Sequence, residues 1–403
     1  MELDIIGLVS ACSYALDCIE AELVHVTNRH GKRVAYISVC MAEKFGIIGE
    51  ALQDLAMCAL LHDNALTQYI SEEVRHDLIK DQTMDISSKK LGVHCVYGEQ
   101  NIKKLPFYTD VTNVILYHHE NADGTGPFRK KWEEIPLFAR IIHLCDTIDI
   151  IGNTGGYDQQ NWEQAKAYLV KYENTIFDAE CVKAFLEVFS EEKFADMGGE
   201  ELEKRLWEKV PRKKQFCDEG TCKDLFAQIV DYKSEFTGMH SIGVAKKAAA
   251  LAEHLGYDRL DIQKIYLAGA LHDIGKMAIG NEILEKPGRL TDEEFSKMKN
   301  HAGYTYMILS EVEDFEEIRD WAALHHEKLD GSGYPFGKTA EELNEPERIL
   351  ACVDIYQALT EDRPYKKGMT HEQACGILED MAQKGWIDAK ITGQVRECFG
   401  EIH

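Results

Sequence analysis

Two series of histidines and aspartates with matching spacing run through this chain. Ten of its sixteen histidines belong to them. The first interval is 32 residues in both series (62 − 30 and 272 − 240), and a later one is 24 in both (118 − 94 and 325 − 301). This agreement indicates a duplicated domain. The first series comprises His30, His62, Asp63, His94, His118, His119 and Asp146, and the second His240, His272, Asp273, His301, His325, His326 and Asp354.

These residue types predict metal binding. Imidazole nitrogens and carboxylate oxygens suit divalent Mn, Fe or Zn, with Ni and Co as further alternatives, whereas an all-oxygen set favours Mg or Ca. Five histidines and two aspartates exceed what one tetrahedral site needs, so we expect two divalent metals per series, with iron or manganese preferred. Such a pair activates a bridging water and clamps a phosphoryl oxygen, which favours hydrolysis of a phosphoester.

The composition is that of a globular protein and excludes some partners. Hydrophobic residues make up 45% and charged residues 29% of the 403 positions, which suits two or three domains. A formal charge of −25 argues against a nucleic-acid polymer as partner, because such binding uses Lys and Arg to neutralise phosphates. Asp4, Asp17 and Glu20 interrupt the apolar N-terminal segment, so we expect no signal peptide, no membrane span and a cytoplasmic location.

The spacing of apolar residues predicts helices almost throughout. Residues 34–45 and 244–255 follow helical periodicity, and each segment stops at a glycine. Predicted helices over 52–61 and 260–271 end where the two His-Asp pairs begin. Helix ends from a bundle can converge on one cavity, so the sequence predicts an all-α fold of two tandem bundles.

A charged segment containing Gly-Gly, Pro211 and Gly220 separates the halves. We therefore predict domains over residues 1–195 and 223–403, joined by a connector over 196–222. Cys217 and Cys222 in this connector form a CxxxxC pair. No second pair completes a zinc site there, so buried thiols are the simpler interpretation.

The second series sits in longer motifs. These are HDIGK at residues 272–276, HHEKLDGSGYP at 325–335, and Asp354 followed by RPY at 363–365. They resemble the HD superfamily of metal phosphohydrolases and, more narrowly, its HD-GYP family, over about residues 225–403. The resemblance implies HD-type helical domains and hydrolysis of cyclic di-GMP to the linear pGpG, or onward to GMP.

The resemblance also implies residue roles. One metal would be held by His240, His272, Asp273 and Asp354, and the other by Asp273, His301, His325 and His326. His272, Asp273 and Lys276 would be catalytic, with the Lys276 ammonium stabilising phosphoryl charge or protonating the departing 3′ oxygen. Substrate would contact Lys276, Arg363, Lys366, Gly331, Gly333 and Tyr334, of which Arg363 and Lys366 look like a phosphate clamp.

Two positions of the second repeat depart from the family pattern. Gln357 stands where an acidic residue often follows the metal-binding aspartate by three positions, which bears on substrate fit or rate. Members with three metals carry a glutamate four residues before the first histidine. Phe236 occupies that position here, with Glu235 one residue away, so two metals are expected.

The first repeat keeps the ligands and loses the surrounding groups. Leu66 replaces the lysine of HDxGK, residues 118–128 (HHENADGTGPF) lack the tyrosine and one residue, and no Arg-Pro-Tyr follows Asp146. Asp149 retains the acid that the second repeat lacks. We expect this half to bind metal and to turn over a cyclic dinucleotide poorly. Two alternatives are a divided role, in which each half acts on a different phosphoester, and a domain retained for packing or dimerisation.

Three functional hypotheses stay open from the sequence. The main one is a cyclic di-GMP phosphodiesterase acting in the second repeat, with cyclic GMP-AMP as an alternative substrate. The second is a metal- or nucleotide-responsive regulatory module that binds a GGDEF-type partner. The third, a phosphohydrolase of ordinary nucleotides, fits the GYP and Arg-Pro-Tyr segments less well. A homodimer is a further partner hypothesis.

Overall fold

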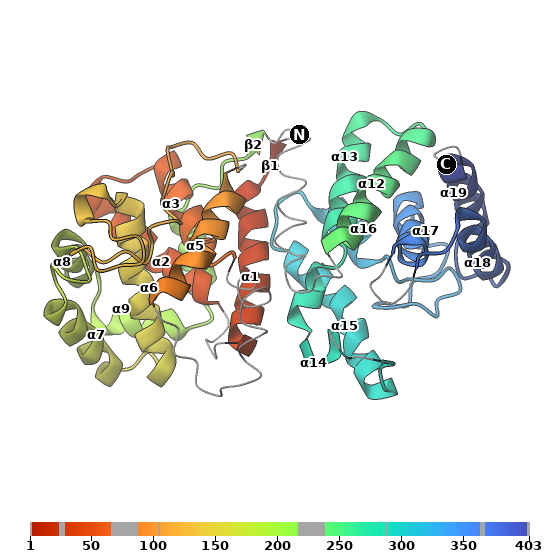
Figure 1. The fold of residues 1–403 in the computed structure, drawn as a ribbon. Helices are drawn as coiled ribbons and strands as arrows, with labels where there is room; N and C mark the ends of the chain where they lie inside the picture. The colour runs from red at the N-terminus through yellow and green to blue at the C-terminus, as the bar shows by residue number, and fades with distance from the viewer. Residues whose placement is uncertain are drawn as a thin grey trace. The chain divides into compact units, whose positions relative to one another are not determined.

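The computed structural model describes residues 2–23, 29–65, 88–103, 105–216, 238–279, 281–284, 286, 288–362 and 367–400. Their contacts divide the chain into two units (Figure 1). One unit is Asp4–Gln215, and the other is Phe216–His403 together with Met1–Leu3. The first part of the predicted connector, through residue 215, thus groups with the first unit, whereas Cys217 and Cys222 lie outside the described residues.

Both units are helical, which confirms the predicted fold class. The described chain also holds two strands of two residues each, β1 (Glu2–Leu3) and β2 (Gln215–Phe216), which pair in one sheet. The sequence analysis predicted no strand. Two residues are too short for an alternating pattern of apolar and polar side chains to be recognised.

The first unit is built around helix α2. The bounds are α1 Ile5–Leu23, α2 His30–Ala42, η1 Glu43–Phe45, α3 Glu50–Leu60, α5 Ser88–Ile102, η3 Trp132–Glu134, α6 Leu137–Gly155, α7 Gln159–Lys171, α8 Ala179–Val188, α9 Glu191–Ala195, η4 Asp196–Gly198 and α10 Leu202–Lys209. Every residue of α2 is buried, and α2 packs against α1, α3, α6, α8 and α10.

Burial of α2 includes two basic side chains, which need partners inside the unit. Lys32 pairs with Glu203 of α10, and Arg33 pairs with Asp149 of α6. The helix runs into η1 and stops at Gly46, whose φ of +69° lies in the left-handed region that glycine adopts readily. The predicted glycine stop is therefore present.

The second unit repeats this plan around α12. The bounds are α12 Gly238–His254, α13 Arg259–Leu271, η5 Ile274–Ala278, α14 Asn281–Leu284, α15 Asp292–Leu309, α16 Glu316–Ala323, α17 Glu345–Thr360, α18 His371–Gln383 and α19 Ala389–Gly400. Helix α12 packs against α13, α17 and α19, and Gly256 after it has a φ of +82°.

Side-chain caps fix the starts of the helices that carry later site residues. Thr291 and Glu294 form a reciprocal capping box at α15, and Asn344 and Glu347 form another at α17. Each box satisfies backbone N–H groups that the first turn leaves without partners. None of the helices in the described part of the chain is long and apolar enough to cross a membrane.

Candidate metal centres

The second repeat brings all seven predicted ligands into one place from separate elements. His240 lies in the first turn of α12, His272 and Asp273 follow α13, and His301 projects from α15. His325 and His326 follow α16, and Asp354 lies on α17. Two groups have ligand atoms within 4.8 Å of one another: His240 with His272 and Asp273, and His301 with His325 and His326.

Asp273 lies between these two groups. Its Oδ2 is 3.2 Å from Nε2 of His272, and its Oδ1 is 3.5 Å from Nε2 of His301 and 3.9 Å from Nε2 of His325. One carboxylate thus faces both groups with different oxygens. If a metal ion bound at each group, Asp273 could contribute one oxygen to each.

Backbone carbonyls orient three of the imidazoles. The Nδ1 atoms of His272, His301 and His325 lie 2.7, 2.6 and 2.6 Å from carbonyl oxygens three residues earlier. An Nδ1–H donating to a carbonyl leaves Nε2 free for a metal and fixes the ring plane. These three hydrogen bonds therefore direct the Nε2 atom of each ring toward the centre.

Unpaired buried atoms support a bound cation. Nε2 of His272 and Oδ1 of Asp273 have no hydrogen-bond partner among the described residues, although both side chains are at most 2% exposed. In the first repeat, Nδ1 of the buried His94 has no hydrogen-bond partner among the described residues. Buried polar atoms without partners are destabilising, so these donor sets fit a divalent metal.

His240 is held at both ring nitrogens. Its Nε2 lies 2.9 Å from Oδ1 of Asp354, and its Nδ1 lies 2.9 Å from Oε2 of Glu361. Burial lowers the pKa of His240, but the two carboxylates outweigh it and raise that pKa to about 10. Burial raises the pKa of the Asp354 carboxyl, but the hydrogen bond with His240 outweighs it. The pKa of Asp354 therefore stays below its usual range.

Glu361 is a site residue that the sequence analysis missed. Position 357, where an acid was expected, holds Gln357, whose Nε2 donates to Oε2 of Glu361 at 3.2 Å. Glu361 is the first residue after α17, with extended backbone angles, and lies seven residues after Asp354 (361 − 354 = 7). That spacing is the signal that could have identified it.

Three imidazoles of the second repeat, those of His301, His325 and His326, have lowered pKa values that favour the neutral form. Burial lowers the pKa of His326 to about 4, and it lowers the pKa of His301 and of His325 as well. Metals bind the neutral imidazole, so these three rings need not lose a proton at pH 7.

Lys276 faces the centre as the motif predicted. Its Nζ lies 2.5 Å from Oδ2 of Asp273, and its side chain is 26% exposed. The ammonium is partly exposed beside this carboxylate, so it is accessible to a bound substrate. Its counterpart Leu66 lies outside the described residues, as do Arg363 and Lys366.

The predicted tight loop beside His326 is present. The ring of Tyr334 lies 4.8 Å from that of His326, and Gly331 has a φ of +78°. A Cβ on Gly333 would lie 2.3 Å from the backbone nitrogen of Lys328, so this position has no room for a side chain. The loop therefore depends on glycine at both positions.

In both repeats, the glutamate that follows the paired histidines accepts hydrogen bonds from the backbone of the loop after them. Glu327 accepts hydrogen bonds from the backbone N–H groups of Phe336, Gly337 and Lys338 at 2.7 to 3.0 Å. Glu120 accepts from residues 128 and 130 in the first repeat. The shared His-His-Glu triplet was the available signal, and the sequence analysis assigned it no role.

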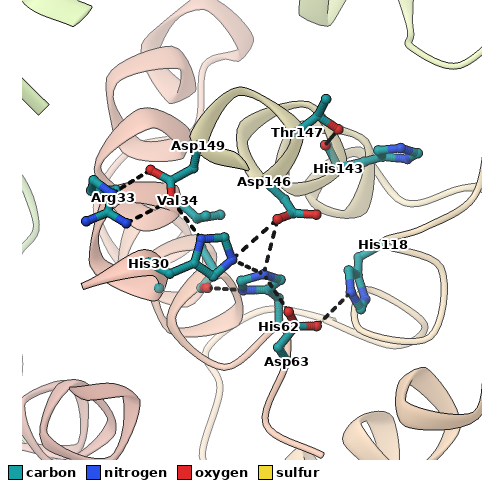
Figure 2. A network of polar contacts seen from close by, with 12 residues as sticks. His30, Arg33, Val34, His62, Asp63, His118, His143, Asp146, Thr147 and Asp149 are labelled. Carbon is teal, nitrogen blue, oxygen red and sulfur yellow. Dashed lines mark hydrogen bonds and ion pairs between the residues drawn. The ribbon is translucent and has the colours of Figure 1, made fainter. Parts of the chain in front are cut away.

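The first repeat has a similar centre around Asp63 (Figure 2). Its Oδ1 is 3.2 Å from Nε2 of His94 and 3.4 Å from Nε2 of His118, and its Oδ2 is 3.4 Å from Nε2 of His62. His30 Nε2 lies 3.3 Å from Oδ1 of Asp146. His119 lies beside them, with its ring 4.0 Å from that of His118.

Asp149 takes the place of Glu361 in this repeat. Its Oδ2 lies 2.7 Å from Nδ1 of His30, and its Oδ1 accepts from Nε of Arg33 at 2.6 Å and from the Tyr157 hydroxyl at 2.5 Å. Figure 2 shows His30 between Asp146 and Asp149. Burial raises the Asp149 pKa, but His30 and Arg33 outweigh it and keep this pKa lowered.

A cavity of about 850 Å³ borders the second repeat between α12, α17, α18 and α19. Its walls include Lys246, Lys247 and Lys367 together with the ring of Tyr356. Lys247 donates to Oε1 of Gln357 at 2.6 Å, which connects this wall to the Glu361–His240 pair. Asp362 and Glu372 also line the cavity, so its three lysines leave a small local excess of positive charge in a chain with a formal charge of −25.

Comparison with known families identifies the two repeats. The HD domain family matches residues 15–181 and 224–391. The chain therefore belongs to the HD domain family. The resemblance to HD-GYP proteins with a divergent first HD domain is thereby confirmed, and the histidine and aspartate clusters of the chain could hold metal ions, as is typical of HD phosphohydrolases.

Relatives of this HD protein extend over the whole chain. It is 28% identical over 391 residues to 3′3′-cGAMP-specific phosphodiesterase 1 of Vibrio cholerae, covering 94% of this chain and 88% of that protein. It is 42% identical over 159 residues to a cyclic di-GMP phosphodiesterase of Pseudomonas aeruginosa, covering 39% of this chain and 38% of that protein.

A solved structure shares the fold of the HD protein from end to end. It is the cyclic GMP-AMP specific phosphodiesterase V-cGAP3 of V. cholerae, which aligns with a TM-score of 0.68 and 24% identity. The alignment covers 99% of this chain and 98% of that one. The two proteins therefore share a fold.

Proposed function

We propose that this protein is a metal-dependent cyclic dinucleotide phosphodiesterase, that its substrate is 3′3′-cyclic GMP-AMP, and that its catalytic centre is the second repeat. The observation that carries the proposal is the second centre, in which Lys276 touches the bridging Asp273. The similarity over 88% of a 3′3′-cGAMP-specific enzyme supports the substrate.

This substrate was the alternative in the sequence analysis, where cyclic di-GMP came first. The relative that acts on cyclic di-GMP is more similar in sequence, at 42%, but only over 159 residues. Cyclic di-GMP therefore stays as the second candidate substrate. Both dinucleotides contain the same phosphodiester, so the residues around the metals serve either one.

The residues of the second centre have different roles in the proposed reaction. Asp273 faces both metal positions, and His272, His301 and His325 direct Nε2 toward them. Bound metal ions, with iron or manganese as our proposal, would supply Lewis acidity toward the phosphoryl oxygen and lower the pKa of a coordinated water. Lys276 would stabilise charge on the phosphoryl group or protonate the departing 3′ oxygen.

The lysines that line this cavity support a nucleotide substrate. Lys246 and Lys367 are exposed, and their ammonium groups can pair with a phosphate. We assign this surface to the part of the dinucleotide away from the cleaved bond. Replacing both lysines with alanine would then raise KM more than it lowers kcat.

The experiment that tests the function compares three substrates on purified protein loaded with Mn²⁺ or Fe²⁺. We expect kcat/KM to be highest for 3′3′-cyclic GMP-AMP, lower for cyclic di-GMP and lowest for cyclic di-AMP. Failure to hydrolyse any of them would contradict the proposal, and a preference for cyclic di-GMP would replace the substrate with the second candidate.

Matched variants assign the reaction to one repeat. Asp273→Ala removes the bridging carboxylate of the second centre, and Asp63→Ala removes its counterpart in the first. We expect the first variant to abolish turnover and the second to retain most of it. The reverse result would move catalysis to the first repeat, for which we propose a regulatory, metal-binding role.

The regulatory-module hypothesis predicts a different outcome in cells. A His272→Ala/Asp273→Ala variant that still binds the nucleotide but no longer signals would support the enzyme. Unchanged signalling by the same variant would favour a receptor that acts through a GGDEF-type partner.

A further inference from the structure

A thiol lies inside the histidine cluster of the first repeat. Cys95 follows His94 on α5, is fully buried, and places its Sγ 3.6 Å from Nε2 of His94 and 3.8 Å from Nδ1 of His118. Ligand atoms of His94, Cys95, His118 and His119 all lie within 4.8 Å of one another. A single ion could therefore contact the sulfur and the imidazoles together.

The second repeat has no sulfur at this place. The residue after His301 is Ala302, which is buried and offers no donor atom. The corresponding cluster of His301, His325 and His326 contains imidazoles alone. The two centres thus differ in donor chemistry at a position where their histidines match.

One imidazole beside Cys95 also differs from its counterpart. His301 directs Nδ1 at the Met298 carbonyl oxygen at 2.6 Å, whereas Nδ1 of His94 is buried and unpaired within the described structure. His118 resembles its counterpart His325, because its Nδ1 lies 2.7 Å from the Ile115 carbonyl oxygen, and its Nε2 lies 3.4 Å from Oδ1 of Asp63. A buried imidazole with an unsatisfied nitrogen, His94, beside a sulfur points to a cation rather than to packing alone.

We propose that Cys95 is a thiolate ligand which, with His94, His118 and His119, gives the first repeat a preference for a soft divalent metal such as Zn²⁺ or Co²⁺ over Mn²⁺. Binding converts the thiol to a thiolate, and the proton passes to solvent as the metal–sulfur bond forms. Thiolate is the softer donor and selects zinc-like ions, whereas imidazole and carboxylate alone also suit Mn and Fe. The two halves of the chain would then hold different metals.

This inference rests on metal binding by the first repeat and is independent of the phosphodiesterase reaction. The full-length protein is loaded with Co²⁺ in an Asp273→Ala background, which weakens the second centre. We expect a near-ultraviolet absorption band from charge transfer between thiolate and Co²⁺. Cys95→Ala, which copies the alanine at position 302, should lose the band and the preference for Zn²⁺ over Mn²⁺.

Two controls keep the test decisive. Cys181→Ala removes another fully buried thiol, in α8, and should keep the band. Ala302→Cys in an Asp63→Ala background should create a band in the second centre, which covers the case that Cys95→Ala fails to fold. The proposal is overturned if Co²⁺ binds the first repeat without the band, if Cys95→Ala retains the band, or if the first repeat binds no metal.

Discussion

Glu361 and His240 form a hydrogen-bonded pair at 2.9 Å that replaces the pair of Asp149 and His30 at 2.7 Å in the first repeat. The partner carboxylate has moved one helical turn along the sequence, from the position of Gln357 to that of Glu361. Each centre therefore has a carboxylate that orients the first histidine of its series, although alignment of the two repeats suggests that one is missing.

Glu361→Gln is expected to weaken metal binding at the second centre. Loss of a carboxylate that orients a ligating histidine costs about 10- to 100-fold in metal affinity. Competition with a chromophoric chelator measures this affinity. Gln357→Asp in the same chain should restore part of it, because Asp149 acts from that position in the first repeat. An affinity unchanged by Glu361→Gln would show that the pair has no role in metal binding.

Lys276→Met is expected to lower kcat with little change in metal content. A positioned proton donor contributes about 10²- to 10⁴-fold to rate, and Lys276 touches Asp273 without being a metal ligand in our assignment. Steady-state kinetics and metal analysis of the same preparations measure the two effects. Lys286→Met, which removes a lysine paired with Glu294, serves as the control. Equal losses of metal and of activity would instead give Lys276 a structural role.

Metal affinity of the second centre should rise with pH between 7 and 9. His240 has a pKa of about 10 in the metal-free protein, so it is protonated across this range and must release a proton when a metal binds Nε2. Releasing one proton makes the apparent affinity rise about tenfold per pH unit below that pKa. Calorimetry in buffers of different ionisation enthalpy measures the proton count, and a count of zero would contradict this expectation.

Gly333→Ala is expected to impair the loop beside His326. The added Cβ would lie 2.5 Å from Cα of Glu327, so the loop must shift, at a cost of about 1–3 kcal/mol in unfolding free energy. We expect kcat/KM to fall because Tyr334 is the next residue. Gly376→Ala, in α18 with open space around it, should leave activity unchanged. Normal activity and stability of Gly333→Ala would refute the role of this loop.

Removal of metal by a chelator should destabilise the protein. The buried atoms Nδ1 of His94, Nε2 of His272 and Oδ1 of Asp273 would lose the metal as a partner. A ligand that binds only the folded state stabilises it by an amount that grows with the logarithm of the ligand concentration. Thermal unfolding with and without chelator measures the shift. Re-addition of metal should reverse it, and an unchanged unfolding temperature would argue against metal occupancy.

The sequence by itself determined the duplication, the helical fold and the identity of the clustered residues. Equal intervals in two series of histidines and aspartates predict two related domains, because ligands at fixed spacing must come from the same helices in each copy. The glycine stops and apolar periodicity predicted α2 and α12, since both signals depend on local backbone geometry.

Only the tertiary structure decided which residues support the ligands. Glu361 contacts His240 across 121 positions of sequence, and Asp149 contacts His30 across 119. The sequence did not distinguish Cys95 from the other eleven cysteines. The tertiary structure showed that its sulfur lies beside the histidines of the first repeat. Contacts of this kind depend on how helices pack and on which side chain fills the space between them, and neither is encoded in spacing along one chain.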